Sequence, residues 1–103
     1  MVNRFNQMLG LATKAGRTVS GEFAVEQAVK SREAVLVIIA QDASGNTKKH
    51  FHDMCNYRDI PILEICSKEE LGRYTGKKER ASVALLDQGF AEKLISIKRE
   101  GSI

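Results

Sequence analysis

The stretch ATKAGRTVSGEFAVEQAVKS, residues 12–31, combines a glycine turn, a short extended segment and the start of a helix. In its second half, apolar residues recur at the spacing of one helix face and predict a helix over residues 21–31. These residues are Val25, Ala28 and Val29. The extended segment 18–20 precedes this helix. We expect Ser20 to cap the helix by accepting a hydrogen bond from a free backbone N–H, and Glu22 to complement the helix dipole.

The start of this helix has the composition of a nucleic-acid contact. Lys14 and Arg17 flank it, and such cations hold phosphates while polar groups contact base edges. Gly21 has no side chain and therefore allows a partner to approach the backbone closely. A helix N-terminus also presents free N–H groups to an anion. We therefore predict an RNA-binding edge here.

Size and composition limit the class of protein. The chain has 103 residues, 43% of them apolar, which predicts a single domain over residues 1–103. A net charge of +3 and a pI near 9.0 permit a polyanionic partner without requiring one. Cys55 and Cys66 are too few for a disulfide framework, and no run is long and apolar enough for a leader or a membrane span. We expect a soluble, cytoplasmic, monomeric protein without membrane contact.

The run VLVIIA at residues 35–40 is β-branched and lacks polar alternation, which predicts a central strand covered on both faces. We expect Ser67 and Glu70 to form a capping box, Gly16 and Gly76 to end helices, and residues 98–99 to fray as a basic tail. We also expect helices over residues 3–15 and 47–57, and a short helix that this capping box opens and that runs through residues 71–74. The strands are expected at 18–20, 62–66 and 81–86, and a final helix is marked by Phe90, Leu94 and Ile97. This alternation predicts a three-layer α/β/α sandwich around a small mixed β-sheet.

Two residues of the predicted edge allow more than one interpretation. Phe23 points away from the apolar face of its helix, so it either packs on an RNA base or ribose or lies under neighbouring polypeptide. Glu22 is either a first-turn acid that complements the dipole or an acceptor for guanine amino groups.

The segment GKKER, residues 76–80, is the densest positive cluster in the chain. It is either a solvated surface or a phosphate clamp, and its place between a short helix and a buried strand favours the clamp. It is not a nucleotide-binding P-loop, because the glycine spacing is one residue too short and no Ser or Thr follows Lys77.

The other candidate chemistry is weak. His50 and His52, two residues apart on one helix, point to different sides and cannot chelate a metal together, and Cys55 is expected in the core. Asp42 follows a buried strand, where α/β proteins place ligands, but it is also a simple cap for the following helix. We expect no enzyme activity, no cofactor and no metal.

Several segments agree in order and spacing with one known family: LATKAGRTVSG, VIIAQDASGNTKKH, CNYRDIPI and SKEELGRYTGKKERASVALLDQGFAEKL. On these segments, within residues 9–96, the chain resembles the L7Ae/L30e superfamily of ribosomal proteins, and in particular its bacterial YlxQ and YbxF members. CNY at residues 55–57 and DQGFA at 87–91 are similar to the YlxQ branch. The resemblance implies an L30e-like sandwich that binds kink-turn RNA, a sharply bent internal loop with tandem sheared G·A pairs.

In that family the N-terminus of the second helix enters the groove at the G·A pairs, and the loop before the last strand contacts the loop nucleotides. By position, the resemblance implies RNA contacts from ten residues here. They are Lys14, Arg17, Gly21, Glu22, Phe23, Gln27, Asp42, Lys77, Lys78 and Arg80.

The centre of the implied site departs from the archaeal pattern, which reads Gly-Thr-Asn-Glu with a Lys three residues on. Here Gly21 is followed by Glu22, Phe23 and Ala24, with Gln27 at the Lys position. A lost bidentate base contact costs about 1–3 kcal/mol in duplex readout, so we expect weaker or differently tuned RNA binding. The charged loop stands where archaeal relatives are apolar and should raise salt sensitivity.

Three functions compete. We favour a non-catalytic, structure-specific RNA-binding protein, associated with the ribosome or translation, whose partner is structured RNA such as ribosomal RNA. A protein-interaction scaffold with a weakened RNA site is the alternative, because an exposed Phe23 is also a good protein anchor. A nucleotide-binding or enzymatic domain is suggested only by Asp42 and the small α/β architecture.

Overall fold

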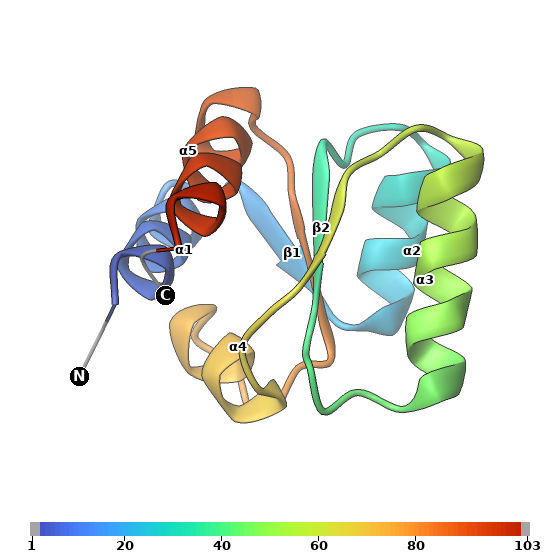
Figure 1. Ribbon diagram of the computed structural model, residues 1–103, viewed down its shortest axis with the longest axis horizontal. Helices are drawn as coiled ribbons and strands as arrows, with labels where there is room; N and C mark the ends of the chain where they lie inside the picture. The colour runs from blue at the N-terminus through green and yellow to red at the C-terminus, as the bar shows by residue number, and fades with distance from the viewer. Residues whose placement is uncertain (1–2, 102–103) are drawn as a thin grey trace.

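The structure is a computed structural model that describes residues 3–101 (Figure 1). Five helices and four strands alternate along the described chain. The helices are α1 (Arg4–Lys14), α2 (Glu22–Lys30), α3 (Gly45–Tyr57), α4 (Lys68–Tyr74) and α5 (Gln88–Glu100). The strands are β1 (Thr18–Ser20), β2 (Leu36–Ile39), β3 (Ile62–Glu64) and β4 (Ser82–Leu85).

The strands form one mixed sheet in the order β1-β4-β2-β3. β2 and β3 are parallel, whereas β4 is antiparallel to both of its neighbours, with Ala84 opposite Val19 on one side and Val37 on the other. Every residue of the two central strands is buried, which confirms the prediction for the uninterrupted apolar run in β2. The edge strands β1 and β3 are only partly buried.

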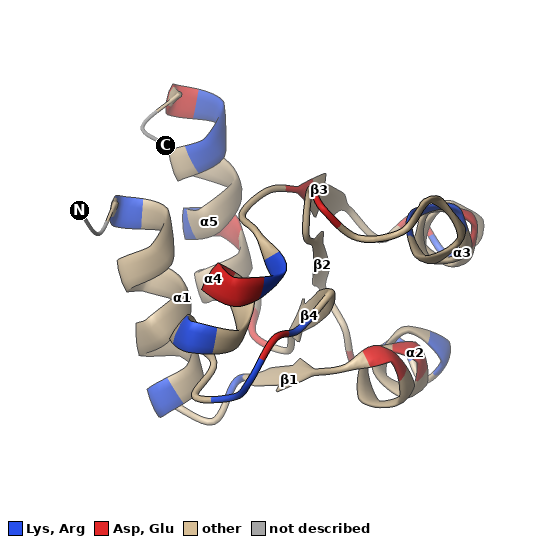
Figure 2. Ribbon diagram, turned by 90° about the horizontal axis from the view of Figure 1, so that it is seen from below, with Lys and Arg blue, Asp and Glu red and all other residues tan. Residues whose placement is uncertain are grey.

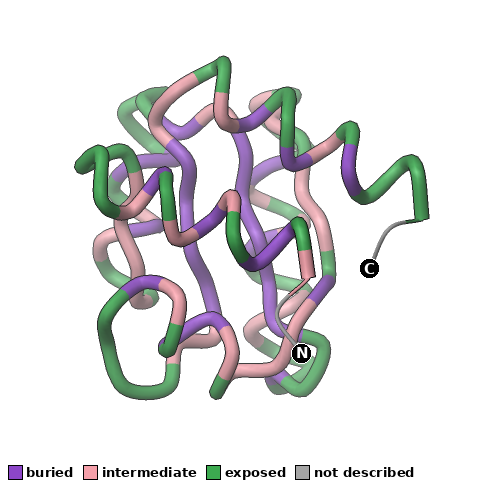
Figure 3. Tube along the Cα trace, turned by 90° about the vertical axis from the view of Figure 1, so that its left-hand side faces the viewer, coloured by how far each residue is buried: buried purple, intermediate pink, exposed green. Residues whose placement is uncertain are grey.

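Helices cover both faces of the sheet. α2 and α3 lie side by side on one face and α1 and α5 on the other, while α4 lies beneath α1 and next to the start of β4 (Figure 1). The residues of the central strands are buried, and the exposed residues of the helices lie on the outside of the molecule (Figure 3). The predicted α/β/α sandwich with a small mixed sheet is confirmed.

The topology brings several chain segments to one edge of the sheet. β1 and β2 both run antiparallel to β4 and are therefore parallel to each other. Each is followed by a helix that runs back along the sheet, so α2 and α3 begin at the same edge, the lower one in Figure 1. The segment 77–80 leads into β4 at that edge as well, because Ser82 of β4 pairs with Ile39 at the end of β2.

Most predicted helix boundaries hold, and two are wrong. α3 begins at Gly45 rather than Thr47, because the Ser44 hydroxyl accepts a hydrogen bond from the Thr47 N–H and so caps the helix earlier. Residues 98–99 do not fray: they form the last turn of α5, where cations complement the helix dipole, and Gly101 caps the helix in the left-handed conformation. The capping box at the start of α4 is confirmed.

Residues 3–101 contain neither a membrane-spanning helix nor a cluster of metal ligands. None of the five helices has the length and apolar content to cross a membrane. No group of three His, Cys, Asp or Glu side chains in this range is arranged to hold a metal ion.

Candidate nucleic-acid interface

The N-terminus of α2 is the least protected helix start in the described chain. Side chains cap the other four helices, but none caps α2, whose N-cap position is Gly21. The first N–H groups of a helix have no partner within the helix, so those at the start of α2 face outward as donors. Gly21 adopts φ +93°, which only glycine adopts without strain.

The predicted cap by Ser20 is wrong. Its hydroxyl accepts a hydrogen bond from Nε of Arg80 at 3.3 Å instead, and Gly21 occupies the cap position. The Arg80 side chain therefore lies beside the helix start. A Cβ added to Gly21 would sit 3.8 Å from Arg80 Nε, so the glycine backbone and the guanidinium are close neighbours. The interaction joins the end of β1 to the segment before β4.

The basic segment 77–80 is held in place by α4 through main-chain hydrogen bonds. The Lys77 N–H donates to the Gly72 carbonyl at 2.8 Å, and the Arg80 N–H donates to the Lys68 carbonyl at 3.1 Å. Gly72 also leaves room for the segment, because a Cβ there would lie 1.8 Å from the Lys78 carbonyl oxygen. The backbone thus positions these cations, and it leaves the side chains of Lys77 and Lys78 available to a ligand.

A cavity of about 440 Å³ joins the two parts of the interface. Its lining comes from α1, β1, α2, α4 and the basic segment. These residues are Thr13, Thr18, Val19, Ser20, Ala24, Thr75, Lys77 and Arg80. The residues on either side of Gly21 and the segment 77–80 are distant in sequence, but both line this one cavity.

Five of the other predicted residues do not line this cavity, and all five are exposed. Glu22 and Phe23 are exposed in the first turn of α2, and Phe23 has 77% of its surface in solvent. This excludes the interpretation that Phe23 lies under neighbouring polypeptide. Gln27 is exposed one turn further along the same helix. Lys14 at the end of α1 and Arg17 just before β1 are also exposed. Arg17 lies at the other end of β1 from the start of α2, because its carbonyl accepts a hydrogen bond from the N–H of Leu86, the residue after β4.

Asp42 plays a different structural part from the one expected. Its Oδ1 accepts a hydrogen bond from the Lys68 N–H at 2.8 Å, so it caps α4 and not the following helix α3, which Ser44 caps. Asp42 remains exposed at the edge where Arg80 lies, since Arg80 is bonded to the same residue Lys68.

Cations at this edge lack carboxylate partners. Figure 2, seen from below, shows basic segments at the end of α1 and along the stretch that leads into β4. We call this set the basic edge: Lys77, Lys78 and Arg80 at the edge itself, completed by Lys14 at the end of α1 and Arg17 just before β1. Within residues 3–101, none of the five makes a salt bridge. The carboxylates of Glu22 and Glu79 are also free of salt bridges within that range. An unpaired cluster of this kind is suited to phosphate.

None of the histidines and cysteines lines the 440 Å³ cavity. His50 bonds to Glu26 of α2 and His52 to Glu64 of β3, so the two rings point to opposite sides as predicted. Burial raises the pKa of Cys55 to about 11. Burial, and then the nearby Glu70 carboxylate, raise the pKa of Cys66 to about 12. Thiols with such high pKa values are poor nucleophiles and poor metal ligands at neutral pH.

Sequence reasoning missed two features of the interface. Gly72 was not identified, although a glycine inside a helical pattern signals a close approach of another segment. The contact between Arg80 and Ser20 joins residues 60 positions apart, and no local pattern announces it. A hydrogen bond of 3.1 Å between Thr13 and Thr18 also supports the cavity floor from α1.

Known proteins are similar to this chain in sequence and in fold. The RNA-binding protein YlxQ of Bacillus subtilis (strain 168) is 47% identical over 90 residues, which cover 87% of this chain and 90% of that protein. The YlxQ protein of Enterococcus faecium is 35% identical over 86 residues, covering 84% of this chain and 82% of its own length.

Solved structures agree. A protein of unknown function from Bacillus halodurans C superposes with a TM-score of 0.90 at 35% identity, covering 93% of this chain and 97% of its own. The Giardia lamblia 15.5kD RNA binding protein superposes with a TM-score of 0.78 at 22% identity, over 96% of this chain and 86% of its own, which shows the shared fold alone. Residues 3–95 match the family described as ribosomal protein L7Ae/L30e/S12e/Gadd45. The chain therefore belongs to the ribosomal protein L7Ae/L30e/S12e/Gadd45 family.

Proposed function

We propose that this chain is a non-catalytic, structure-specific RNA-binding protein that recognises kink-turn RNA and works with the ribosome or in translation. The observation that carries the proposal is the uncapped start of α2 beside unpaired cations from two distant segments. Membership of the ribosomal protein family and the 47% identical relative named as an RNA-binding protein support it.

The proposed contacts divide into phosphate and base groups. The five cations of the basic edge neutralise phosphates, which fixes the register of the RNA without reading its sequence. Gly21 lets the backbone approach the RNA, and the N–H groups at the start of α2 donate to it. Glu22 and Gln27 contact base edges, and Phe23 packs on an unstacked base or ribose. Asp42, whose Oδ1 accepts a hydrogen bond from the first residue of α4, contributes a carboxylate to the proposed RNA contacts.

Arg80 links the two groups of contacts. Its guanidinium donates to the Ser20 hydroxyl at 3.3 Å and to the Glu79 carbonyl at 3.0 Å. A guanidinium has five N–H bonds, and those not used in these two hydrogen bonds are free to bond a phosphate. This geometry holds the cation beside the helix start before any RNA arrives, so little side-chain freedom is lost on binding.

The test compares a kink-turn RNA with the same RNA after its sheared G·A pairs are converted to Watson–Crick pairs. We expect the kinked RNA to bind more tightly, and its advantage to persist at higher salt, because shape readout adds to the phosphate term. Equal affinity of the protein for both RNAs at every salt concentration would reject structure-specific recognition.

A protein-interaction scaffold is the second candidate, and the exposure of Phe23 favours it. A protein partner recovered from cells equally well before and after RNase treatment, and lost with Phe23→Ala, would support the scaffold. Loss of the partner on RNase treatment would instead support the RNA-binding function.

A further inference from the structure

A second cavity opens between α1 and α4, and Lys14 is the one kink-turn contact proposed above that lines it. It measures about 620 Å³, and its walls include Gly10, Leu11, Arg73 and Tyr74. Leu11 keeps 52% of its surface in solvent, although it is a large aliphatic side chain. Gly10 leaves space in front of the Tyr74 ring, since a Cβ there would be 3.9 Å from the ring atom Cδ1. The cavity is therefore an exposed apolar slot with an aromatic wall.

Its charge suits a polyanion. Lys14 and Arg73 line the cavity, and no carboxylate does. Lys14 makes no salt bridge within residues 3–101, while Arg73 pairs with Glu69 at 3.1 Å in an exposed contact that a phosphate can replace. The Gln7 side-chain amide, which also lines the cavity, can both donate to and accept from a base edge. An aromatic ring, an aliphatic side chain and cations together form the usual platform for an unpaired nucleotide.

The cavity is continuous with the basic edge. Thr13 lines both this cavity and the 440 Å³ cavity beside Arg80. Gly76 lines the one and Lys77, the next residue, lines the other. A strand that leaves the basic edge therefore meets this slot next.

We propose that the cavity between α1 and α4 holds one unpaired nucleotide of an RNA strand that continues from the kink-turn. The base packs between Leu11 and Tyr74, and the flanking phosphates lie near Lys14 and Arg73. The proposal rests on the proposed RNA-binding function, because continuity with the basic edge is part of its support.

Tyr74 and Tyr57 are the only tyrosines of the chain, which makes fluorotyrosine labelling a direct probe of the cavity. Tyr57 is 81% exposed at the far end of α3 and serves as the internal reference. In fluorine NMR, we expect millimolar uridine trinucleotide to shift the Tyr74 signal and to leave the Tyr57 signal in place. An abasic trimer with the same phosphates should leave both signals unchanged. An unmoved Tyr74 signal, or an equal shift with the abasic trimer, would overturn the proposal.

A second measurement separates this proposal from the kink-turn proposal. Leu11→Glu places a carboxylate in the cavity, and Tyr57→Glu makes the same change on a remote exposed surface. For a kink-turn RNA with a single-stranded extension, Leu11→Glu should lower affinity by about fivefold or more, and Tyr57→Glu should not. For the blunt kink-turn RNA, Tyr57→Glu should bind like the original protein. Leu11→Glu should lose less affinity for it than for the extended RNA, because Lys14 is the only kink-turn contact that its carboxylate can reach.

The outcomes are distinguishable. Suppose that the blunt kink-turn RNA binds, and that Leu11→Glu lowers affinity for the extended RNA no more than for the blunt RNA. The cavity then does not hold the nucleotide, and the kink-turn proposal stands. If no kink-turn RNA binds while the trinucleotide still shifts Tyr74, the kink-turn proposal fails and the nucleotide cavity stands. A Tyr74 signal that shifts without RNA as the protein concentration rises would place a second copy of the chain in the cavity. That result would overturn the nucleotide assignment.

Discussion

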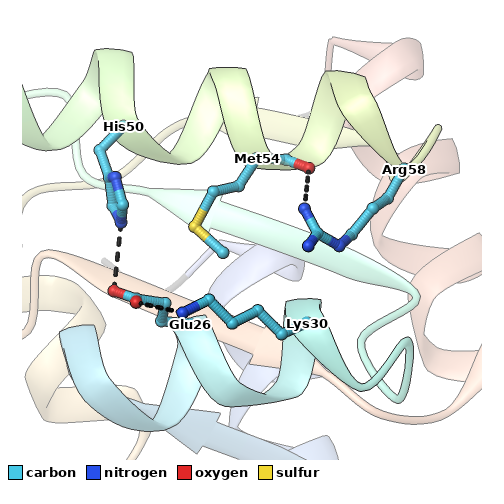
Figure 4. Close-up of polar contacts among 5 residues, drawn as sticks. All are labelled: Glu26, Lys30, His50, Met54 and Arg58. Carbon is cyan, nitrogen blue, oxygen red and sulfur yellow. Dashed lines mark hydrogen bonds and ion pairs between the residues drawn. The ribbon is translucent and has the colours of Figure 1, made fainter.

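The outer surface of α2 and α3 and the basic edge carry their charges in opposite arrangements. On the helices, cations are matched by carboxylates: Glu26 lies 3.0 Å from Lys30 and 3.1 Å from His50 (Figure 4), and Asp53 lies 2.6 Å from Lys49. Met54 points from α3 toward α2, between His50 and Arg58 along the helix (Figure 4). At the basic edge, none of the five cations forms a salt bridge within residues 3–101.

The difference shows how a chain with a net charge of only +3 can present a polyanion site. Matched charges on a helix surface contribute little stability, about 0–1 kcal/mol for each pair, but they cancel the local field. Unmatched cations leave a positive potential where they cluster. The placement of the carboxylates, more than the number of cations, therefore selects the surface that can attract a polyanion.

The largest effect is expected from Gly72→Ala, which disturbs the support of the basic edge. The added Cβ would lie 1.8 Å from the Lys78 carbonyl oxygen and 3.0 Å from the Glu79 Cα, both backbone atoms. Overpacking of this kind costs about 1–3 kcal/mol, and the segment that carries the lysines must move. Urea denaturation should show the loss of stability, and an RNA titration should show weaker binding.

Gly45→Ala is the matched control for that change. Gly45 begins α3, and its added Cβ would meet nothing within 4 Å. Its stability should stay the same or rise slightly. Equal urea midpoints for the two alanine variants would contradict the packing role of Gly72.

The next effect concerns the unmatched lysines. Lys77→Ala/Lys78→Ala should weaken binding to every RNA and reduce the slope of log affinity against log salt by about 1.4–1.8, because two phosphate contacts are lost. Lys30→Ala/Lys49→Ala removes the same charge from the matched helix surface and should change the slope much less. Titrations at several salt concentrations compare the two double variants. If both double variants reduced this salt slope equally, the matched helix surface and the basic edge would not differ in RNA binding.

The two exposed aromatic residues test whether position matters as much as exposure. Phe23 is 77% exposed at the start of α2, and Tyr57 is 81% exposed at the end of α3. Phe23→Ala should cost about 1–3 kcal/mol of RNA-binding free energy, the usual value for a stacked base, with unchanged unfolding. Tyr57→Ala should leave RNA affinity unchanged. An equal loss in both variants, measured by titration, would remove Phe23 from the interface.

The smallest effect is a pH dependence of the matched region. Hydrogen bonds from Lys30 and then His50 hold the pKa of the Glu26 carboxyl below its ordinary value of 4.5. A carboxyl with a lowered folded-state pKa stabilises the fold above that ordinary value, and the stabilisation is lost as pH falls through the lowered pKa. Between about pH 5 and pH 3, the original protein should therefore lose more stability than Glu26→Gln.

Thermal unfolding across that pH range measures the effect. Glu22→Gln, which removes a carboxylate with no ion pair in the described chain, is the control and should keep the pH profile of the original protein. A Glu26→Gln profile that matches the original would show that the pair with Lys30 and His50 does not contribute.

The sequence predicted the layers of the fold well, because the apolar run at 35–40 and the helical spacing in α2 are local signals. Phe23 was predicted to leave the apolar face of its helix, and it is exposed. Ser20 was wrong as a cap because its hydroxyl is bonded to Arg80, a tertiary contact that no local pattern contains. The interpretation of Asp42 as a cap of α3 was wrong for the same reason, since its bonding partner lies in α4. The proposed RNA contacts themselves stay predictions.

The attachment of segment 77–80 through main-chain atoms has a consequence for how the interface can change. The N–H groups of Lys77 and Arg80 bond to carbonyl oxygens of α4, so the path of the segment depends on backbone atoms that every residue type except proline supplies. Replacing the side chains there, while keeping Gly72, should alter ligand preference without rebuilding the scaffold. Homologous proteins can diverge in specificity at these positions at little structural cost, and an engineer can use the segment as a cassette for retargeting.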